Sequence, residues 1–377
     1  MSDMKRVLVI GMSPVYGGIE AFLINIFRNI DSTKVRMDFL TFCQKCACEE
    51  ELIARGSEVF HLTRRGENPI KNKKELRDFF SSHADSYDYV WIQMSSASNI
   101  TPNVMARKYT NAKIISHSHG TAFESSALAK PVHIVLDRLN RKKFIRCTDF
   151  CFACSEAAGK YLFTGFNEPV KVIKNGIDSQ SYAYNPNIQA QIKHELDAEN
   201  STVIGHAGRL SAIKNQAFLI DMFKEYLKLD GNAVLAIAGD GELRQQLEEH
   251  AASLEVTDKV RFLGFRSDFN RLLQGFDLFV LPSFNEGLPL TLVEAQSSGL
   301  PCLASDTITN EVSLTELMHF APLGDGAEKW AKAAKEIIDN SSQGRGAPCF
   351  TEAVRAAGFD AKDSAKDLQS FFSGKAE

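Results

Sequence analysis

Short apolar runs that alternate with helical segments constrain the fold of this 377-residue chain more than any other feature. Residues 6–11 have the composition of a buried parallel strand, and residues 19–30 then carry apolar side chains at helical spacing. Similar runs recur in the first half at 37–42, 58–62, 89–93, 112–116 and 149–155. Because strands separated by helices form parallel sheets, this half predicts a doubly wound α/β domain.

The same alternation begins again in the second half, with apolar runs at 202–208, 233–240, 260–265, 276–281 and 301–304. The length suits two domains that each bury a core of their own. We place them at residues 1–178 and 179–355, with the polar segment 179–200 carrying the crossing between them. Residues 356–377 are expected to form a last helix.

The net charge of −4 conceals an asymmetry between the halves. Residues 1–175 contain 25 Lys and Arg against 18 Asp and Glu, whereas residues 176–377 contain 18 against 29. A basic half indicates an anionic partner such as lipid headgroups or a lipid-linked phosphate. No nucleic-acid-binding motif is visible, so nucleic acid is not expected. No apolar run could span a membrane, there is no signal peptide, and the eight cysteines form no secreted framework, which favours a cytoplasmic protein.

The stretch 279–306 carries the clearest chemical signal. A short strand leads into a polar loop, and Leu288-Pro289 opens a helix that contains Glu294 and ends near Gly299. Glu286 and Glu294 have seven residues between them, which would separate them by ~12 Å along a fully helical segment. That length would suit a nucleotide-sugar: Glu286 at the sugar, the amides near Gly287 and Leu288 at phosphate, and Glu294 at the ribose. Two isolated surface acids on a solvated helix would be the ordinary alternative.

This stretch closely resembles the E-x7-E signature of the retaining GT-B glycosyltransferases of family 4, within which the chain is similar to bacterial capsular and exopolysaccharide transferases. A second segment, 208–215, matches the family pattern G-R-L-x4-K-N. The resemblance covers about residues 6–340 and implies two Rossmann-like domains that face a cleft. It also implies that the final helix crosses back onto the first domain.

Arg209 and Lys214 lie five residues apart in a loop between a strand and a helix. By themselves they could be two surface bases. A departing nucleoside diphosphate needs such cations, since Arg gives two-pronged hydrogen bonds and Lys supplies a point charge. We therefore predict that both contact the donor diphosphate and that no metal or other cofactor is required. The absence of a plain Asp-x-Asp motif agrees with this.

The first half offers two further candidates. His117 and His119 leave the end of a strand, where open α/β sheets bind ligands, although structural roles are equally common for such residues. In the resembled family a His-Gly pair here reaches the donor sugar, which selects His119 first and His117 second. The pair Gly17 and Gly18 begins a helix and corresponds to the family loop near the donor phosphates, although a tight turn would explain it equally well.

Three signals are weaker. The resemblance suggests that the backbone near Phe265 and Arg266 holds the base. Cys43, Cys46 and Cys48 lack the second ligand pair of a zinc site, so idle or structural thiols are expected. Residues 138–146 are basic with apolar interruptions, which indicates either a solvated helix face or a peripheral contact with an anionic membrane.

The resemblance implies a retaining sugar transfer from a nucleotide-sugar, expected to be UDP-linked, to a glycan or lipid-linked oligosaccharide acceptor in surface polysaccharide synthesis. Glu286, His119, Arg209 and Lys214 would carry the reaction. A GT-B nucleotide-sugar epimerase and a non-catalytic nucleotide-sugar-binding subunit are the alternatives. The sequence does not name the sugar, the base, the acceptor or the linkage.

Overall fold

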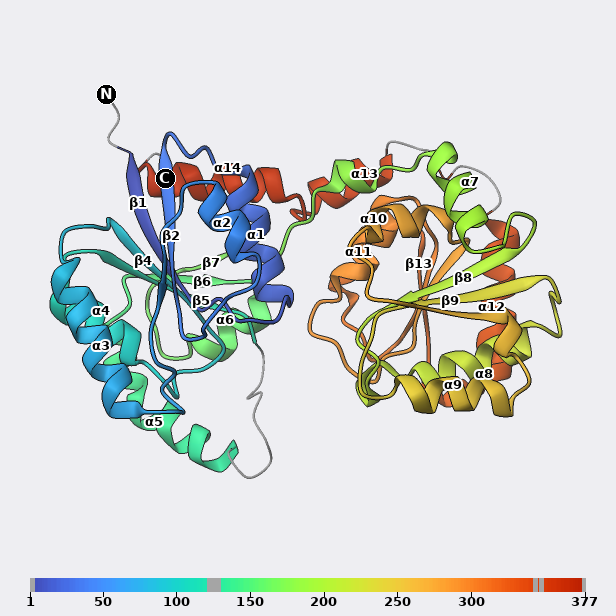
Figure 1. Ribbon diagram of the computed structural model, residues 1–377, viewed down its shortest axis with the longest axis horizontal. Helices are drawn as coiled ribbons and strands as arrows, with labels where there is room; N and C mark the ends of the chain where they lie inside the picture. The colour runs from blue at the N-terminus through green and yellow to red at the C-terminus, as the bar shows by residue number, and fades with distance from the viewer. Residues whose placement is uncertain (1–3, 121–129, 342–344, 346–348, 375–377) are drawn as a thin grey trace. The chain divides into compact units, whose positions relative to one another are not determined.

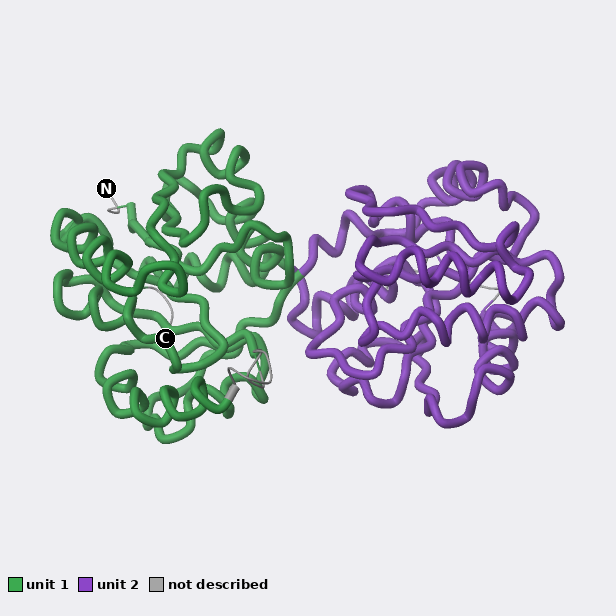
Figure 2. Tube along the Cα trace, turned by 60° about the horizontal axis from the view of Figure 1, so that its bottom comes forward, with its two compact units in different colours: residues 1–176, 361–377 green, residues 177–360 purple. Residues whose placement is uncertain are grey.

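The computed structural model describes residues 4–120, 130–341, 345 and 349–374, and it divides into two compact units. Unit 1 comprises residues 1–176 and 361–377, and unit 2 comprises residues 177–360 (Figure 2). The segment expected to carry the crossing, 179–200, is instead folded within unit 2 as the 3-10 helix η1 (Ser179–Tyr182) and helix α7 (Pro186–Glu195). The chain enters unit 2 at Ile177 and leaves it at Asp360, and these two residues pair as neighbouring strands do.

Unit 1 is built on one parallel sheet with the strand order β3-β2-β1-β4-β5-β6-β7 (Figure 1). Its strands are β1 (Lys5–Ile10), β2 (Val35–Thr41), β3 (Val59–His61), β4 (Tyr89–Met94), β5 (Lys113–Ser118), β6 (Phe150–Ala153) and β7 (Val170–Val172). Its helices are α1 (Gly18–Asn29), α2 (Glu49–Ala54), α3 (Pro69–Ser82), α4 (Thr101–Tyr109), α5 (Lys130–Arg146), α6 (Glu156–Leu162) and α14 (Ala361–Phe372).

Alternate side chains of these strands supply two separate cores. Val7 and Val9 of β1 pack with α1, α2 and α14 on one face, whereas Leu8 and Ile10 pack with α3 and α4 on the other. Successive strand residues point to opposite faces, so a strand that is apolar throughout must be covered on both sides. Helix α14 buries Leu368 and Phe372 in the first of these cores.

Unit 2 repeats the design with the order β10-β9-β8-β11-β12-β13. Its strands are β8 (Thr202–Ala207), β9 (Ala233–Ala238), β10 (Val260–Gly264), β11 (Leu278–Leu281), β12 (Cys302–Ser305) and β13 (Met318–Ala321). Its remaining α-helices are α8 (Gln216–Tyr226), α9 (Arg244–Ser253), α10 (Phe269–Leu272), α11 (Leu290–Ser297), α12 (Gly326–Asn340) and α13 (Cys349–Ala356). Its other 3-10 helices are η2 (Ala212–Lys214), η3 (Thr257–Lys259), η4 (Leu273–Gly275), η5 (Asn310–Val312) and η6 (Leu323–Asp325).

Both sheets place the third, second, first and fourth strands of their unit in that spatial order, as dinucleotide-binding folds do. The prediction of two doubly wound parallel-sheet domains is confirmed. Helix α13, which belongs to unit 2, has no counterpart in the predicted elements.

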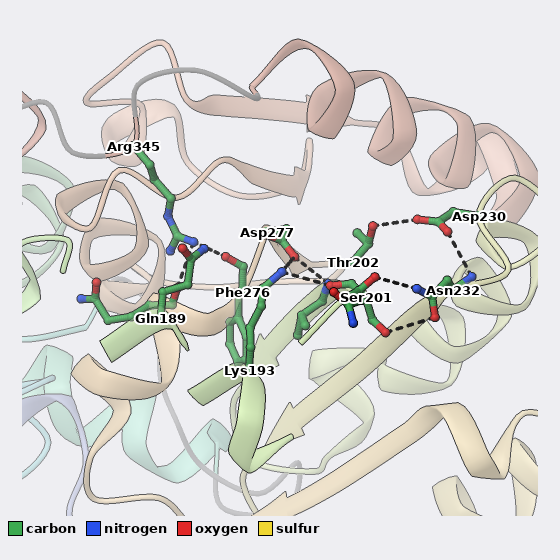
Figure 3. Close-up of polar contacts among 12 residues, drawn as sticks. Gln189, Lys193, Ser201, Thr202, Asp230, Asn232, Phe276, Asp277 and Arg345 are labelled. Carbon is green, nitrogen blue, oxygen red and sulfur yellow. Dashed lines mark hydrogen bonds and ion pairs between the residues drawn. The ribbon is translucent and has the colours of Figure 1, made fainter. Parts of the chain in front are cut away.

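Polar contacts hold the amino ends of the unit 2 strands together (Figure 3). Asp277, just before β11, accepts hydrogen bonds from Lys193 Nζ of α7 and from the backbone N–H of Val203 in β8, each over 2.8 Å. The guanidinium of Arg345 donates to the carbonyls of Leu273, Gln274 and Phe276 beside the same edge. These contacts connect segments within unit 2, and the candidate site lies at the opposite, carboxyl edge of the sheet.

Candidate functional site

The strand order of unit 2 reverses between β8 and β11, which are adjacent in the sheet. Open parallel sheets bind ligands at the carboxyl ends of such strands, because the two loops diverge to opposite faces and leave a crevice. The loop after β8 carries Lys214, and the loop after β11 carries Glu286. Lys214 Nζ lies 2.6 Å from Glu286 Oε1, and the two side chains are 19% and 13% exposed. The structure thus pairs two residues that the sequence predicted for the site.

Backbone contacts fix this pairing. The N–H of Phe284 donates to the carbonyl of Ile213 over 2.9 Å, and Asn215 Nδ2 donates to the carbonyl of Pro282 over 3.2 Å. Asn215 has φ 56° and ψ 40°, a left-handed conformation that Asn tolerates better than most residues. This residue ends η2 and begins α8, so the turn that presents Lys214 is set by the backbone rather than by the ion pair alone.

The loop after β8 also lies against the loop after β9. The N–H of Gly208 donates to the carbonyl of Ala238, and a Cβ atom at Gly239 would stand 2.0 Å from the carbonyl oxygen of Gly208. Gly239 has φ +129°, which L side chains rarely adopt. Only glycine therefore permits the approach of these two loops, which supports the backbone around Arg209.

A buried histidine lies beneath the same loop. His206 Nδ1 is 2.9 Å from the carbonyl of Val280, and its Nε2 is 3.2 Å from Gln216 Nε2, which also donates to the carbonyl of Arg209. Burial lowers the pKa of His206 to about 4, so the ring is neutral at pH 7. A neutral ring can donate to Val280 and accept from Gln216 at once, and so ties β8, β11 and the start of α8 together.

Arg209 has a different partner from Lys214. Its guanidinium contacts Glu242 over 3.1 Å, and its side chain is 74% exposed. The two cations predicted to face one diphosphate therefore form separate ion pairs in the structure, with Glu242 and Glu286 respectively. An exposed pair of this kind is held weakly, so little free energy is needed to redirect Arg209.

Glu294 lies within α11, next to η1. Tyr182 of η1 donates from its hydroxyl group to Glu294 Oε1 over 2.7 Å. Burial raises the pKa of Glu294 to about 7, while the Tyr182 hydrogen bond lowers it by less. The carboxyl group thus titrates near neutral pH. Helix α11 begins at Leu290 with Pro289 as its N-cap, so the chain from Glu286 to Pro289 is not helical and the predicted ~12 Å spacing does not apply to it.

The other predicted donor-site positions of unit 2 differ in their exposure to solvent. Gly287 is exposed, with no atom within 4 Å of the position that a Cβ would take, and Leu288 is half-buried. Phe265, which follows β10, is 78% exposed. Arg266 is committed to Asp268 through contacts of 2.7 and 2.8 Å, and this hydrogen bonding raises its pKa. The structure thus leaves Phe265 free for a ligand and gives Arg266 a structural role.

In unit 1 the two predicted histidines are neighbours with ring centroids 4.2 Å apart. His117 is fully buried, stacked on Trp91, and neither of its ring nitrogens has a partner among the described residues. His119 is partly exposed, and its Nε2 lies 2.7 Å from Gln93 Oε1. Burial lowers the pKa of His119 to about 3 and that of His117 well below its usual value. Exposure therefore favours His119 over His117 as a ligand contact.

The glycine loop of unit 1 contains a carboxylate, Glu20, that was not among the predicted site residues. Glu20 Oε1 accepts from the N–H of Ser13 over 2.9 Å, and its Oε2 accepts from the N–H of Gly17 over 3.1 Å. Gly17 is the N-cap of α1, and Glu20 is the third residue of the helix, as in a capping box. The N–H of Gly17, predicted to lie near donor phosphate, is thus occupied by Glu20, whereas Gly18 has open space beside it.

Two other predictions concern unit 1. Residues 138–146 lie in α5, but Arg141 is not part of its exposed basic surface, because it pairs with Asp137 and donates to the carbonyl of Leu162. Cys43, Cys46 and Cys48 are free thiols. Burial raises the pKa of Cys46 to about 12. Among the residues that the structure describes, no three His, Cys, Asp or Glu side chains gather as metal ligands would.

Comparisons with known proteins agree with this arrangement. The family model described as "Glycosyltransferase Family 4" matches residues 16–181, and the model described as "Glycosyl transferases group 1" matches residues 187–343. EpsF of Bacillus subtilis, which is named as a glycosyltransferase, is 34% identical over 358 residues, or 88% of each chain. An Escherichia coli UDP-Gal:alpha-D-GlcNAc-diphosphoundecaprenol alpha-1,3-galactosyltransferase is 32% identical over 247 residues, which is 63% of this chain and 62% of that one.

Solved structures agree on the fold. The Anabaena protein Alr3699/HepE, crystallised in complex with UDP, superposes with a TM-score of 0.78 at 21% identity and covers 98% of this chain and 100% of its own. Two matched family models and a relative that aligns over 88% of the chain therefore support one assignment. The chain is a glycosyltransferase enzyme of GT-B architecture and belongs to glycosyltransferase family 4.

Proposed function

We propose that this enzyme transfers a sugar from a UDP-linked donor to a lipid-linked saccharide during surface polysaccharide synthesis, with the anomeric configuration retained as the resemblance implies. The Lys214–Glu286 pair at the switch point of unit 2 carries the proposal, because it sets a cation for phosphate beside a carboxylate for sugar hydroxyls. The E. coli relative is named for a UDP-galactose donor and a diphosphoundecaprenol-linked acceptor. The Anabaena protein has also been solved in complex with UDP-glucose.

The donor diphosphate is assigned to Lys214 and Arg209. An ammonium group has three donors, so Lys214 can keep its bond to Glu286 and still donate to a phosphate oxygen. Arg209 can leave its exposed partner Glu242 and give a two-pronged contact. The N–H groups near Gly287 and Leu288 supply further donors. Together these groups would stabilise the charge that develops on the departing diphosphate, and on this account no metal ion is required.

Burial and charge also suggest which residues contact the sugar, the ribose and the base of the nucleotide-sugar. Glu286 accepts hydrogen bonds from the sugar, and Glu294 accepts them from the ribose. Phe265 presents an exposed ring to the base. His119 is neutral because burial lowers its pKa to about 3, so it acts as a hydrogen-bonding group toward the sugar and not as a cation. If Gln93 Oε1 accepts from His119 Nε2, the free lone pair lies on Nδ1, which is buried and has no partner among the described residues.

The lipid-linked acceptor requires contact with a membrane surface. None of the described helices is both long and apolar enough to cross a bilayer. Helix α5 exposes Val132, Val135 and Leu139 by 58%, 55% and 74%, at the spacing of one helical stripe. Its exposed basic residues are Arg138, Lys142, Lys143 and Arg146, and with the apolar stripe they form what we name the α5 face. Mixed basic and apolar side chains on one helix favour peripheral binding at an anionic, cytoplasmic membrane face.

Nucleotide release tests the proposal directly. The purified protein is offered UDP-, GDP- and ADP-linked sugars with and without lipid-diphosphate saccharides, and free nucleotide is measured together with the product linkage. We expect release from one UDP-sugar that rises when an acceptor is present, and a product with the donor's anomeric configuration. Release that never depends on an acceptor, with a change of sugar configuration, would instead identify an epimerase.

A further inference from the structure

A depression lies in unit 1, at the same carboxyl edge of the sheet as His119. Two cavities of about 690 and 630 Å³ share Phe42 and Arg64 in their linings. Their walls come from the chain just after β1, β2, β3 and β4, including Met12, Leu62 and Ser98. We name this continuous depression the Arg64 groove. Its place at the carboxyl ends of four parallel strands is where open α/β sheets bind ligands.

The charge of the Arg64 groove is positive. Lys45, Arg64 and Arg65 line it, and Glu67 is the one carboxylate among the residues that line the two cavities. Lys45 is paired with Glu50, but Arg64 is exposed, and its guanidinium has no hydrogen-bond or ion-pair partner among the described residues. Arg65 is partly buried and donates to the carbonyl of Ser98 over 3.4 Å. Two neighbouring guanidinium groups with unused N–H donors are suited to the oxygens of a diphosphate.

The groove also has an apolar side. Phe42, Pro69 and Leu136 line it, and Ile70, the next residue after Pro69, is 83% exposed. Leu136 belongs to α5, whose exposed stripe of apolar side chains begins at Val132. Helix α3 begins at Pro69, so its partial positive charge lies beside the same wall. Cationic and apolar surfaces side by side match a ligand that is itself both anionic and apolar.

We propose that the Arg64 groove binds the diphosphate of a lipid-diphosphate, with Arg64 and Arg65 on its phosphate oxygens and the apolar wall against the first part of its lipid chain. This inference rests on the proposed function, in which such a molecule is the acceptor. The donor diphosphate does not compete for these residues, since Lys214 and Arg209 of unit 2 are assigned to it. Unit 1 would then recognise its acceptor by the group that joins lipid to sugar.

Direct binding of farnesyl diphosphate, a soluble lipid-diphosphate, tests the groove without any donor or turnover. Isothermal titration compares wild type with the double variant R64Q/R65Q. The control is K73Q/K74Q, which removes the same charge from exposed lysines of α3 that line neither cavity. We expect R64Q/R65Q to weaken binding about tenfold or more, the loss of at least one charge-assisted hydrogen bond, and the control to change it little. Melting temperature and UDP binding in the same samples establish that each variant is folded.

Four other outcomes would overturn the proposal for the Arg64 groove. Equal weakening by both double variants would show only general attraction to positive charge. If R64Q/R65Q binds farnesyl diphosphate as tightly as wild type does, neither arginine contacts the diphosphate. If inorganic diphosphate binds as tightly as farnesyl diphosphate, the apolar wall takes no part. If R64Q/R65Q loses binding to anionic vesicles but keeps farnesyl diphosphate, the arginines contact lipid headgroups instead. Groove binding without sugar transfer from any donor would refute the proposed function and leave the groove standing.

Discussion

Replacing Glu294 with Gln removes an ionisable proton from the proposed ribose site and keeps the shape of the side chain. Burial raises the pKa of Glu294 from 4.5 to about 7, so the folded protein holds a proton that the unfolded chain releases. The free energy of unfolding therefore falls as the pH rises from 4.5 through about 7. The full loss is ~3 kcal/mol, since each pKa unit corresponds to about 1.36 kcal/mol. Gln cannot ionise and avoids this loss, while its amide oxygen can still accept from Tyr182.

Calorimetric melting of wild type and E294Q at about pH 5 and about pH 8 measures the effect. The stability advantage of E294Q should grow by roughly 2 kcal/mol over this interval, or roughly 4–8 °C in the melting temperature of a domain the size of unit 2. E316Q, which changes an exposed glutamate of the same unit, is the control. An equal difference in melting temperature between E294Q and wild type at both pH values would refute the inference that burial raises the pKa of Glu294.

Three further predictions concern catalysis and location. Arg209→Ala and Lys214→Ala should each lower turnover by ~10² or more, whereas Lys332→Ala, at an exposed position of α12, should not. Full activity in the Arg209 or the Lys214 variant would show that this residue does not stabilise the departing diphosphate. Activity should survive excess EDTA, and a loss restored by Mg²⁺ or Mn²⁺ would contradict the metal-free account. The protein should bind anionic but not neutral vesicles, less at high salt, and Glu at the four basic positions of the α5 face should weaken binding. The same change at Lys73 and Lys74 should have little effect; equal loss would make the α5 face an ordinary solvated surface.

Much of the fold could be predicted because buried parallel strands are apolar throughout and separated by helices, a pattern that local sequence shows directly. The sequence could also predict that Lys214 and Glu286 lie in one site, because both follow strands that are neighbours in the predicted fold. The start of α11 was misplaced by two residues, because Pro289 caps the helix from outside instead of occupying its first turn.

Three other contacts were not predicted. Tyr182 and Glu294 are 112 residues apart, and no local pattern pairs them. Arg141 belonged to a basic run in the sequence, but its carboxylate partner one helical turn earlier removes it from the exposed surface. Glu20 did have a local signal, since an acid three residues after a helix N-cap is typical of a capping box.

The last helix of the chain has a consequence for how the protein is made. Unit 2 is one continuous segment, 177–360, and can complete its core once that segment has left the ribosome. Unit 1 begins first, yet α14 supplies Leu368 and Phe372 to its core, so the apolar surface shared by α1 and Trp91 stays uncovered until α14 has been synthesised. Unit 1 would thus be completed after unit 2, although its translation begins first. A nascent chain that stops before α14 would expose this surface in unit 1 and leave unit 2 intact.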